Sequence, residues 1–484
     1  MEKCEKNLNL TEILKCFFMG RYYPVFVCAL VLIGYMTGTE LYLNILNLGM
    51  LSVALCVCDS LRPLVAVLCT FVFQISREHT PADFSMDTVE ANNYYFDGAN
   101  GYIFILSFIP PAVALVVFFV KNKLISKKAL ASLPMLVPSA ILSVALMLGG
   151  AFSGAWSGAS FAYSLSMILI WFIVPYLFIL GFKNEKSKDL IDYFVFLASL
   201  VVIILLSELL YVYLSTDGLI TESGSIKREF LMYGWGNNNT ASQALVILIP
   251  VLFIGAALGG NRHQIYYFSM ATLALLGVVL NVSRSGLLVG GLAYFACAVV
   301  SFIKSSKKKR FLIETGIVLA GIAVIVVASR NVIFSALQDY IDRGVSDTGR
   351  FRLWGEAFEA FKESPVFGKG FFGLYSKDHT DVARMSTVAF LPDMAHNTFF
   401  QLIGSLGVVG LLAYGFYRVC SLRPFIRKPS YMKIMIGAAM LTVLGGSLVD
   451  NFVFYMLPMF NYAVLFAILY KIVEEEGDNK RSLF

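Results

Sequence analysis

The sequence predicts an all-α polytopic membrane protein, and three observations support this fold class. Of its 484 residues, 58% are hydrophobic and only 14% are charged, with a mean hydropathy of +0.74. A soluble protein carries about 25% charged residues, so this chain has too few to cover a surface that faces water. Its apolar residues lie in blocks of roughly 17 to 24, long enough to cross about 30 Å of hydrocarbon as helices. Such segments must be helical because lipid offers no hydrogen-bond partners to the backbone.

The apolar blocks predict about fourteen spans. The third block is short and a tight turn at residues 39–40 joins the first two, so twelve or thirteen spans are the alternatives. The predicted spans lie near residues 22–38, 41–58, 62–76, 101–120, 129–149, 159–182, 190–214, 239–259, 264–282, 285–303, 311–329, 397–419, 431–449 and 452–471. The first block is followed by another span, which is not typical of a cleavable signal peptide. Residues 1–484 are therefore expected to form a single integral membrane domain.

Basic residues predict the orientation of these spans. Lysines and arginines gather in the connections at residues 121–128, 183–188, 304–310 and 423–433, whereas the connections on the other side hold far fewer. By the positive-inside rule both termini are expected in the cytoplasm, which an even number of spans also requires. The net charge of +6 mainly reflects this bias and does not indicate nucleic-acid binding.

Residues 330–396 form the longest connection and are expected to be extracytoplasmic. A connection of this length is usually functional or disordered, and its composition is not that of a disordered segment. Aromatic residues recur at helical spacing between 350 and 363 and predict an amphipathic helix there; they are Phe351, Trp354, Phe358 and Phe361. This aromatic face could rest on the membrane interface or pack on the helical bundle.

Two arginines are candidate ligands of a phosphate group. Arg284 lies between two apolar spans, where a fixed charge is costly unless it is paired or solvated. Snorkelling of its side chain into the headgroup layer is the alternative. Arg350 begins the predicted loop helix, a position that favours acids unless an anionic ligand binds there. The planar donors of a guanidinium fit phosphate oxygens, so two arginines facing one pocket predict a diphosphate site.

His396 begins the predicted span at 397–419 and could exchange protons near neutral pH, with a purely structural role as the alternative. Glu208 is the main acid embedded in a span, where it could pair with Arg284 or face a wet cavity. The predicted substrate contacts beyond the two arginines are Arg352, Trp354, Asn397 and Glu208. The sequence contains no DxD motif or His/Glu cluster that suggests a metal site, and no cofactor is expected.

Two runs of the sequence resemble the O-antigen ligase and polymerase superfamily: TGRFRLWGEAFEAFKESPVFGKGFF and MAHNTFFQLIGSLGVVGLL. Four pieces follow the family order, at residues 283–284, 349–354, 364–370 and 396–397, and the resemblance covers about residues 280–415. It implies a metal-independent glycosyltransferase of the GT-C type. Such an enzyme takes glycan from an undecaprenyl-diphosphate carrier at the outer face of the bacterial cytoplasmic membrane. The resemblance also implies that Arg284 and Arg350 hold the donor diphosphate, while His396 serves the acceptor hydroxyl or the leaving group.

The superfamily contains ligases, Wzy-type polymerases that join carrier-linked repeat units of a surface polysaccharide, and protein-glycosylating enzymes. Two departures favour a polymerase. About fourteen predicted spans exceed the twelve associated with ligases, and no acidic residue lies between Gly404 and Gly407. The expected partners are the carrier-linked oligosaccharide donor, a glycan acceptor and membrane lipid. A chain-length regulator or a flippase is a candidate protein partner.

Two readings from other classes remain open. A transporter of lipid-linked glycan would also need cations for the diphosphate, but transporters usually place polar groups near the bilayer midplane. The candidates in this sequence instead cluster at the ends of spans. A non-catalytic scaffold would leave the two arginines and the histidine unexplained.

Overall fold

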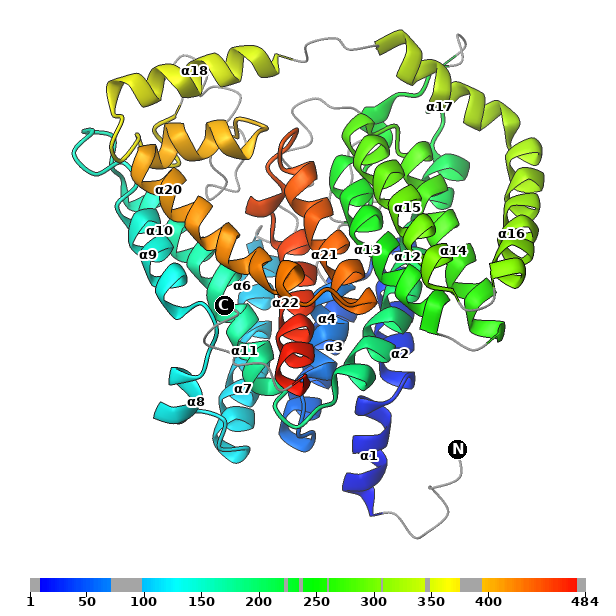
Figure 1. Ribbon diagram of the computed structural model, residues 1–484, viewed down its shortest axis with the longest axis horizontal. Coiled ribbons are helices and arrows are strands. Elements are labelled where there is room, and N and C mark those ends of the chain that lie inside the picture. Colours follow the sequence, from blue (N-terminus) through cyan, green and yellow to red (C-terminus); the bar gives the residue numbers. More distant parts are fainter. Residues whose placement is uncertain are drawn as a thin grey trace.

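The computed structural model of the protein describes residues 9–70, 98–221, 225–234, 238–258, 261–305, 308–343, 349–374 and 394–476. Within these ranges the chain forms helices joined by turns, and the recorded strand contact is one isolated bridge between Ile220 and Ile226. Most helices run side by side in a bundle (Figure 1). The fold is therefore all-α, as predicted.

The helices of the first half are α1 (Leu10–Met19), α2 (Tyr22–Thr37), α3 (Glu40–Val57), α4 (Arg62–Cys69), α6 (Gly98–Ser107), α7 (Ile109–Lys121), α8 (Lys127–Ala131), α9 (Leu136–Met147), α10 (Gly158–Ile168), α11 (Val174–Gly181) and α12 (Ser187–Ser215). Those of the second half are α13 (Asn238–Leu258), α14 (Asn261–Leu280), α15 (Arg284–Lys304), α16 (Lys308–Ala328), α17 (Arg330–Arg343), α18 (Arg350–Glu363), α20 (Thr398–Arg427), α21 (Tyr431–Gly446) and α22 (Met456–Glu475). A π-helical turn, η2 (Leu169–Ile173), joins α10 to α11, and two 3₁₀ turns are η3 (Arg228–Phe230) and η5 (Phe452–Phe454).

The number of spans is smaller than the sequence predicts. Among the described residues, ten helical segments are long and apolar enough to cross a membrane. Helices α1 and α2, bent by 66° where they meet, add an eleventh if they count as one span. The prediction of about fourteen is thus not confirmed, although the apolar helices do identify a membrane protein. The difference arises at short helices: α4 has 8 residues, α9 has 12 and α21 has 16, whereas a span needs about 20.

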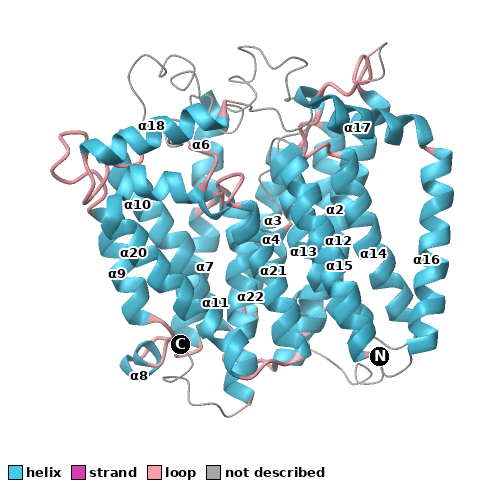
Figure 2. Cartoon of the chain, turned by 45° about the horizontal axis from the view of Figure 1, so that its top comes forward, coloured by secondary structure: helices cyan, strands magenta, loops and turns pink. Residues whose placement is uncertain are grey.

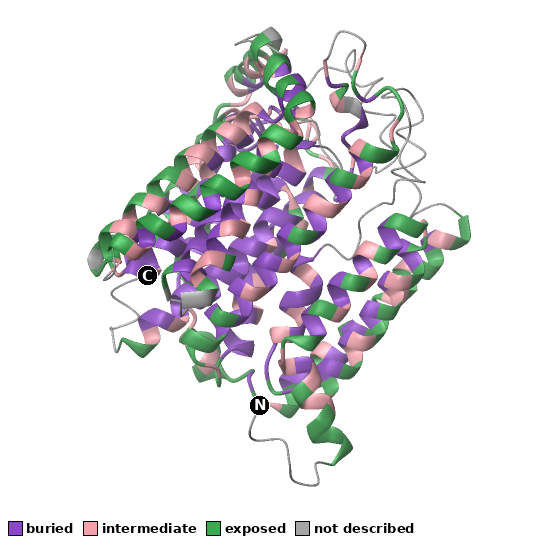
Figure 3. Cartoon of the chain, turned by 90° about the vertical axis from the view of Figure 1, so that its right-hand side faces the viewer, coloured by how far each residue is buried: buried purple, intermediate pink, exposed green. Residues whose placement is uncertain are grey.

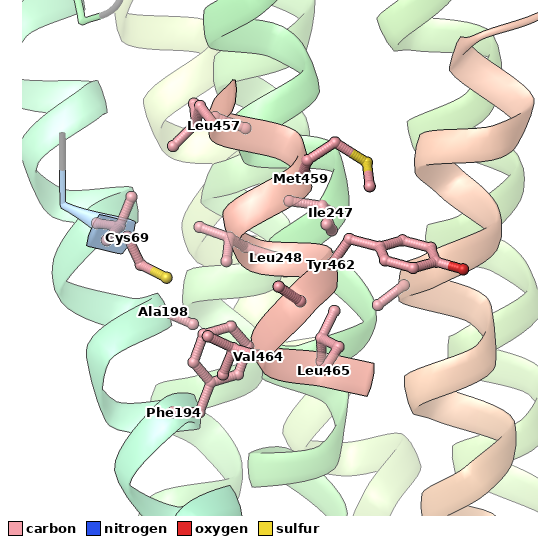
Figure 4. Packing of buried hydrophobic residues seen from close by; sticks show 14 of the residues in the cluster. Cys69, Phe194, Ala198, Ile247, Leu248, Leu457, Met459, Tyr462, Val464 and Leu465 are labelled. Atoms are coloured by element: carbon pink, nitrogen blue, oxygen red, sulfur yellow. The ribbon is translucent and has the colours of Figure 1, made fainter. Parts of the chain in front are cut away.

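Two helices form the centre of the bundle. In the apolar windows of α13 and α22, 89% and 83% of the residues are buried inside the protein. Side chains of α22, including Leu457 and Val464, gather with Ile247 and Leu248 of α13 and Phe194 of α12 (Figure 4). The peripheral helices α15 and α16 are only 22% and 17% buried, and exposed positions cover the outside of the bundle (Figure 3). In lipid, close van der Waals packing holds such helices together.

The two ends of the bundle carry different elements. Helices α17 and α18 lie crosswise over one end, called here the loop end, whereas α1 and α8 lie at the opposite end (Figures 1 and 2). The end of α22 also lies there (Figure 1). Lys471 of α22 donates to the carbonyl of Lys183 at 2.9 Å, and Glu475 accepts from the backbone of Ser187 at 2.8 Å. The basic connection at residues 183–188 therefore lies at the opposite end, away from α17 and α18.

Helix α20 is one of the ten candidate spans, as predicted for residues 397–419, but it is broken inside. Gly407 has φ 66° and ψ −161°, so the helical hydrogen bonds stop there. The glycine-rich segment that follows α18 fills the break. The amides of Lys369 and Gly370 donate to the carbonyls of Gly404 and Ser405, both at 2.8 Å. After the break, the amides of residues 408 and 409 donate to carbonyls of residues 365 and 366 at 2.9 and 3.2 Å.

Helix α18 packs on the first half of α20 through small residues. Ala357 and Ala360 are buried, and a Cβ at Gly404 would lie 3.0 Å from the carbonyl oxygen of Ala357. Phe351 and Phe358 of the predicted aromatic face are instead 64% and 43% exposed. The helix therefore divides its surface, with one side on the bundle and two aromatic rings left facing outward.

Candidate active site

The start of α20 and the turn between α21 and α22 bring one histidine and one aspartate together. Nδ1 of His396 lies 3.0 Å from Oδ1 of Asp450. The Asp450 side chain is 5% exposed and that of His396 is 41% exposed, so the carboxylate is enclosed while the imidazole reaches the surface. A carboxylate at Nδ1 favours the tautomer that is protonated there and leaves Nε2 as the basic nitrogen. This arrangement can accept a proton from a bound hydroxyl.

The Asp450 carboxylate is itself held by its neighbours. Its Oδ1 accepts from the amide of Asn451 at 2.7 Å and from the hydroxyl of Tyr455 at 3.4 Å. Burial and then the Asp450 carboxylate raise the pKa of Tyr455 well above its usual value, so the hydroxyl stays protonated and can donate. The Arg350 guanidinium acts on the Tyr455 pKa in the opposite direction. The charge of Arg350 therefore reaches Tyr455, whose hydroxyl contacts Asp450.

Asn397 joins α20 to the same turn. Its Oδ1 accepts from the amides of Phe399 and Phe400 at 2.8 and 3.3 Å, which caps the helix, and its Nδ2 donates to the carbonyl of Leu448 at 2.7 Å. The backbone of His396, next to it, has a positive φ of 49°, a strained conformation that such a cap helps to hold. The contacts of Asn397 thus position His396, and its predicted contact with substrate remains a prediction.

A buried glutamine lies beneath the pair. Gln401 is 0% exposed. Its Oε1 accepts from the amide of Ala395 at 2.8 Å and from Nδ2 of Asn451 at 3.0 Å. Because these two donors adjoin His396 and Asp450 in the sequence, one side chain fixes the spacing of the two backbones that carry the pair.

Helix α18 reaches the same place from the loop. The indole Nε1 of Trp354 donates to the carbonyl of Ala395 at 2.9 Å, and its ring stacks on Phe400 with centroids 5.2 Å apart and planes 11° apart. Arg350 precedes Trp354 by four residues and so lies on the same face of the helix. The indole therefore anchors the part of α18 that carries Arg350 beside His396. Substrate binding by Trp354 remains a prediction.

Arg352 occupies a different face of α18. Its Nη1 lies 3.8 Å from Oε1 of Glu356, and its side chain is 60% exposed. Positions two residues apart in an α-helix are rotated by about 200° around the helix axis. Arg350 and Arg352 therefore lie on opposite sides of α18. The structure therefore does not bring Arg352 to the histidine–aspartate pair, and its predicted substrate contact remains a prediction.

Arg284 is the first residue of α15, and buried polar groups hold the turn before it. The hydroxyl of Tyr233 donates to Oδ1 of Asn281 at 2.5 Å, and Nδ2 of Asn238 donates to the carbonyl of Asn281 at 2.8 Å. Ser283 caps α15 with its side chain. Tyr233 and Asn238, which belong to the glycine- and asparagine-rich segment 233–240, thus position the Arg284 turn. Residues 235–237 of that segment lie outside the described residues.

Helix α13 contacts both the start of α15, which carries Arg284, and the end of α21, which leads to Asp450. A Cβ at Gly286 of α15 would lie 2.9 Å from the side chain of Ser242, and one at Gly446 of α21 would lie 2.5 Å from Gln243. Ser242 and Gln243 are neighbours near the start of α13. The start of α15 and the end of α21 therefore contact adjacent residues of α13, which places both at the loop end.

Glu208 contacts the Arg284 turn indirectly, through residues 233 and 234. It is 0% exposed, and its Oε2 accepts from the amide of Gly234 at 3.1 Å. Gly234 follows Tyr233, which in turn binds Asn281. The structure therefore connects Glu208 to the Arg284 turn through the 233–234 backbone. Its predicted substrate contact remains a prediction.

Three residues of this site were missed by the sequence analysis: Asp450, Tyr455 and Gln401. A signal existed for Asp450, because it is an acid between two apolar blocks, as Arg284 is a base between two others. No motif or spacing in the sequence marks Tyr455 or Gln401 as a functional residue. Among the described residues, no three His, Cys, Asp or Glu side chains gather as a metal-binding group.

Residues 269–415 match the family model described as O-Antigen ligase. This confirms the resemblance to the O-antigen ligase and polymerase superfamily for that part of the chain. The matched region contains Arg284, Arg350 and His396, whereas Glu208 and Asp450 lie outside it. No curated protein matches the chain. The family match implies an activity of the ligase or polymerase type, on a lipid-linked glycan and an acceptor.

Proposed function

We propose that this protein transfers glycan from an undecaprenyl-diphosphate carrier to an acceptor hydroxyl at the outer face of the bacterial cytoplasmic membrane. The observation that carries the proposal is the buried Asp450 carboxylate on Nδ1 of the partly exposed His396. It lies within a membrane protein whose residues 269–415 match the O-antigen ligase family. The positive-inside bias supports an extracytoplasmic loop end and cytoplasmic termini.

In the proposed reaction His396 is the general base. Its Nε2 takes the proton of the acceptor hydroxyl while the acceptor oxygen forms a bond to the anomeric carbon of the donor sugar. The bond from that carbon to the diphosphate oxygen breaks, and the carrier diphosphate leaves with the electron pair. The enclosed Asp450 carboxylate stabilises the imidazolium that forms. A positioned base of this kind contributes about 10²–10⁴-fold to rate.

The two arginines bind the donor in this proposal. Arg350 begins α18, where the helix amides and the guanidinium together suit an anionic ligand. Arg284 lies at the start of α15 at the same end of the bundle. Charge that develops on the departing diphosphate is stabilised by cations already in place, so the bond can break without a metal ion in this scheme.

The acceptor decides between polymerase and ligase. We retain polymerisation of carrier-linked repeat units of a surface polysaccharide, with transfer to another acceptor as the alternative. The span count no longer favours the polymerase, because about fourteen spans are not found among the described residues. The remaining support is the absence of an acid between Gly404 and Gly407. A chain-length regulator or a flippase is the proposed protein partner.

Reconstitution with a lipid-linked repeat unit tests the proposal. A ladder of longer lipid-linked glycans indicates a polymerase, and transfer to a second added acceptor indicates a ligase. Passage of the substrate across the vesicle membrane without a new glycosidic bond would instead indicate a transporter and overturn the proposal. Activity that needs added Mg²⁺ or Mn²⁺ would contradict the metal-free scheme.

A further inference from the structure

Arg418 is a buried cation that the proposed glycosyl transfer does not use. It lies in α20 after the break and is 7% exposed. Its Nη1 donates to the hydroxyl of Tyr462 at 2.9 Å, whereas its Nε and Nη2 have no hydrogen-bond partner among the described residues. The ion pairs within the described ranges do not involve Arg418. A guanidinium keeps its charge when buried, so a cation inside the membrane domain indicates a function.

Aromatic rings surround this guanidinium where an acid would otherwise be expected. Four ring centroids lie 4.7–5.9 Å from its Cζ, and they form the group called here the aromatic cage: Trp171, Tyr414, Tyr417 and Tyr462. The negative face of such a ring attracts a cation within about 6 Å. Tyr462 belongs to α22 (Figure 4) and Trp171 to the π-helical turn η2. The guanidinium therefore holds α20, α22 and η2 together.

Trp171 connects the aromatic cage to the turn that carries Asp450. Its indole Nε1 donates to the carbonyl of Val453 at 2.7 Å, and its ring centroid lies 5.4 Å from that of Phe454. Both residues belong to η5, which follows Asp450 and precedes Tyr455. A π-helical turn such as η2 is frequent at functional sites. The position of η5 therefore depends on how Trp171 is held.

The rings continue from η5 to the glycine-rich segment after α18. Phe371 of that segment and Phe454 have centroids 5.6 Å apart, and the two side chains are 0% and 2% exposed. A close-packed interior has few voids, so a shift of one ring displaces its neighbours. Arg418 thus supports, through Trp171, both the Asp450 turn and the segment that follows α18.

We propose that Arg418 is a positioning residue for the candidate active site and acts by holding Trp171 against η5. This contact sets the place of the Asp450 carboxylate beside His396. The inference rests on the proposed function, because it assigns Arg418 a role in the glycosyl transfer. Stability alone gives no reason for the arginine, since an apolar side chain of similar volume often replaces a buried charge without loss of stability.

The test compares the full-length Arg418→Met variant with the wild type in two measurements. The first gives kcat and KM for a lipid-linked repeat unit in proteoliposomes. The second is hydrogen exchange of the amides at residues 447–455, measured by mass spectrometry without substrate. Trp171→Phe is a second variant, which keeps a ring but loses the hydrogen bond to Val453.

Tyr176→Phe is the matched control. Tyr176 lies in the same candidate span as Trp171, and its hydroxyl donates to the carbonyl of Pro134 at 3.0 Å, away from η5. This variant also loses one hydrogen bond from an aromatic side chain, and it should leave kcat and the exchange at residues 447–455 unchanged. Melting temperatures verify that all variants fold.

We expect Arg418→Met to lower kcat about tenfold and to change KM by less than about twofold, because a small displacement of the Asp450 carboxylate slows the chemical step. Trp171→Phe should change both parameters in the same direction. The amides at residues 447–455 should exchange faster in both variants, while the melting temperature of Arg418→Met stays close to that of the wild type. Arg418→Lys should recover most of the rate, since an ammonium also binds over aromatic rings.

A double-variant comparison separates positioning from a general structural effect. In the Asp450→Asn background, Arg418→Met should change kcat by less than about twofold, because the carboxylate that it positions is already absent. An equal tenfold decrease in both backgrounds would overturn the positioning role, as would a decrease that only follows the melting temperature. Unchanged exchange at residues 447–455 would overturn the contact through Trp171. A wild type that transfers no glycan would instead overturn the proposed function, because the exchange measurement needs no transfer.

Discussion

The two halves of the candidate active site position their charged groups by different contacts. Around Arg284, buried side-chain amides and a tyrosine hydroxyl hold a short turn between two helices. Around His396, three separate segments meet: α18, the start of α20 and the α21–α22 turn. The first half is built into the bundle, whereas the second brings in Arg350 through the packing of α18 on the start of α20.

This difference indicates which half of the site can change its conformation. A turn fixed by buried hydrogen bonds has one arrangement, because any shift leaves polar groups unsatisfied. A seam made by packing a loop helix on small residues such as Ala357 and Gly404 can open with less loss. In the proposed reaction the donor diphosphate would therefore meet a fixed arginine on one side and a docked arginine on the other.

The largest effect is expected at the base. His396→Ala should lower the transfer rate about 10²–10⁴-fold, because the acceptor hydroxyl loses its proton acceptor. The measurement is single-turnover transfer with lipid-linked substrate in proteoliposomes. Unchanged rates at equal protein level would remove His396 from the proposed chemistry.

Asp450→Asn should lower the rate about 100-fold. Asparagine keeps an oxygen for the Asn451 amide but cannot stabilise an imidazolium. Because this variant preserves the turn, its melting temperature should stay close to that of the wild type. A large fall in melting temperature with unchanged rate per folded molecule would assign Asp450 a structural role only.

Replacing either arginine by lysine compares the two halves directly. Arg284→Lys and Arg350→Lys should each lower the rate about tenfold, since lysine keeps the charge but loses the planar fork. Lys362→Ala removes an exposed cation at the other end of α18, where it pairs with Glu359, and serves as the control. Full activity of both lysine variants, together with a decrease for Lys362→Ala, would mean that only the net charge of α18 matters.

Gly407→Ala tests the docked half through stability. The residue has φ 66°, and a Cβ there would lie 2.4 Å from the carbonyl oxygen of Val366, so the free energy of unfolding should fall by about 1–3 kcal/mol. Gly415→Ala in the same helix is the matched control, because a Cβ there meets nothing within 4 Å. The control should be neutral or stabilising by up to about 1 kcal/mol. Equal melting temperatures for the two variants would contradict the break in α20.

The smallest effect is expected for Trp354→Phe. Phenylalanine can keep the stack on Phe400 but loses the hydrogen bond to Ala395, which is worth about 1 kcal/mol. Limited proteolysis of the segment after α18 should therefore become slightly faster while transfer continues. Complete loss of transfer would mean that the indole contacts substrate, as the sequence analysis predicts.

The sequence by itself determined the membrane class, because apolar blocks with so few charges have no stable alternative in water. It also pointed to Arg284, Arg350 and His396. Charged or titratable residues close to the membrane are costly unless they are paired or solvated, which makes them candidates for a functional site. A helix in the range of α18 followed from aromatic residues at helical spacing. Each of these inferences depends on local composition or local periodicity.

The tertiary structure decided everything that depends on distant contacts. His396 and Asp450 are 54 residues apart and meet only because the start of α20 docks on the α21–α22 turn. The break at Gly407 is stabilised by hydrogen bonds to a segment about forty residues earlier, which no helical pattern in α20 reveals. Hydropathy and spacing report what each segment prefers alone, whereas partners across the bundle are set by packing.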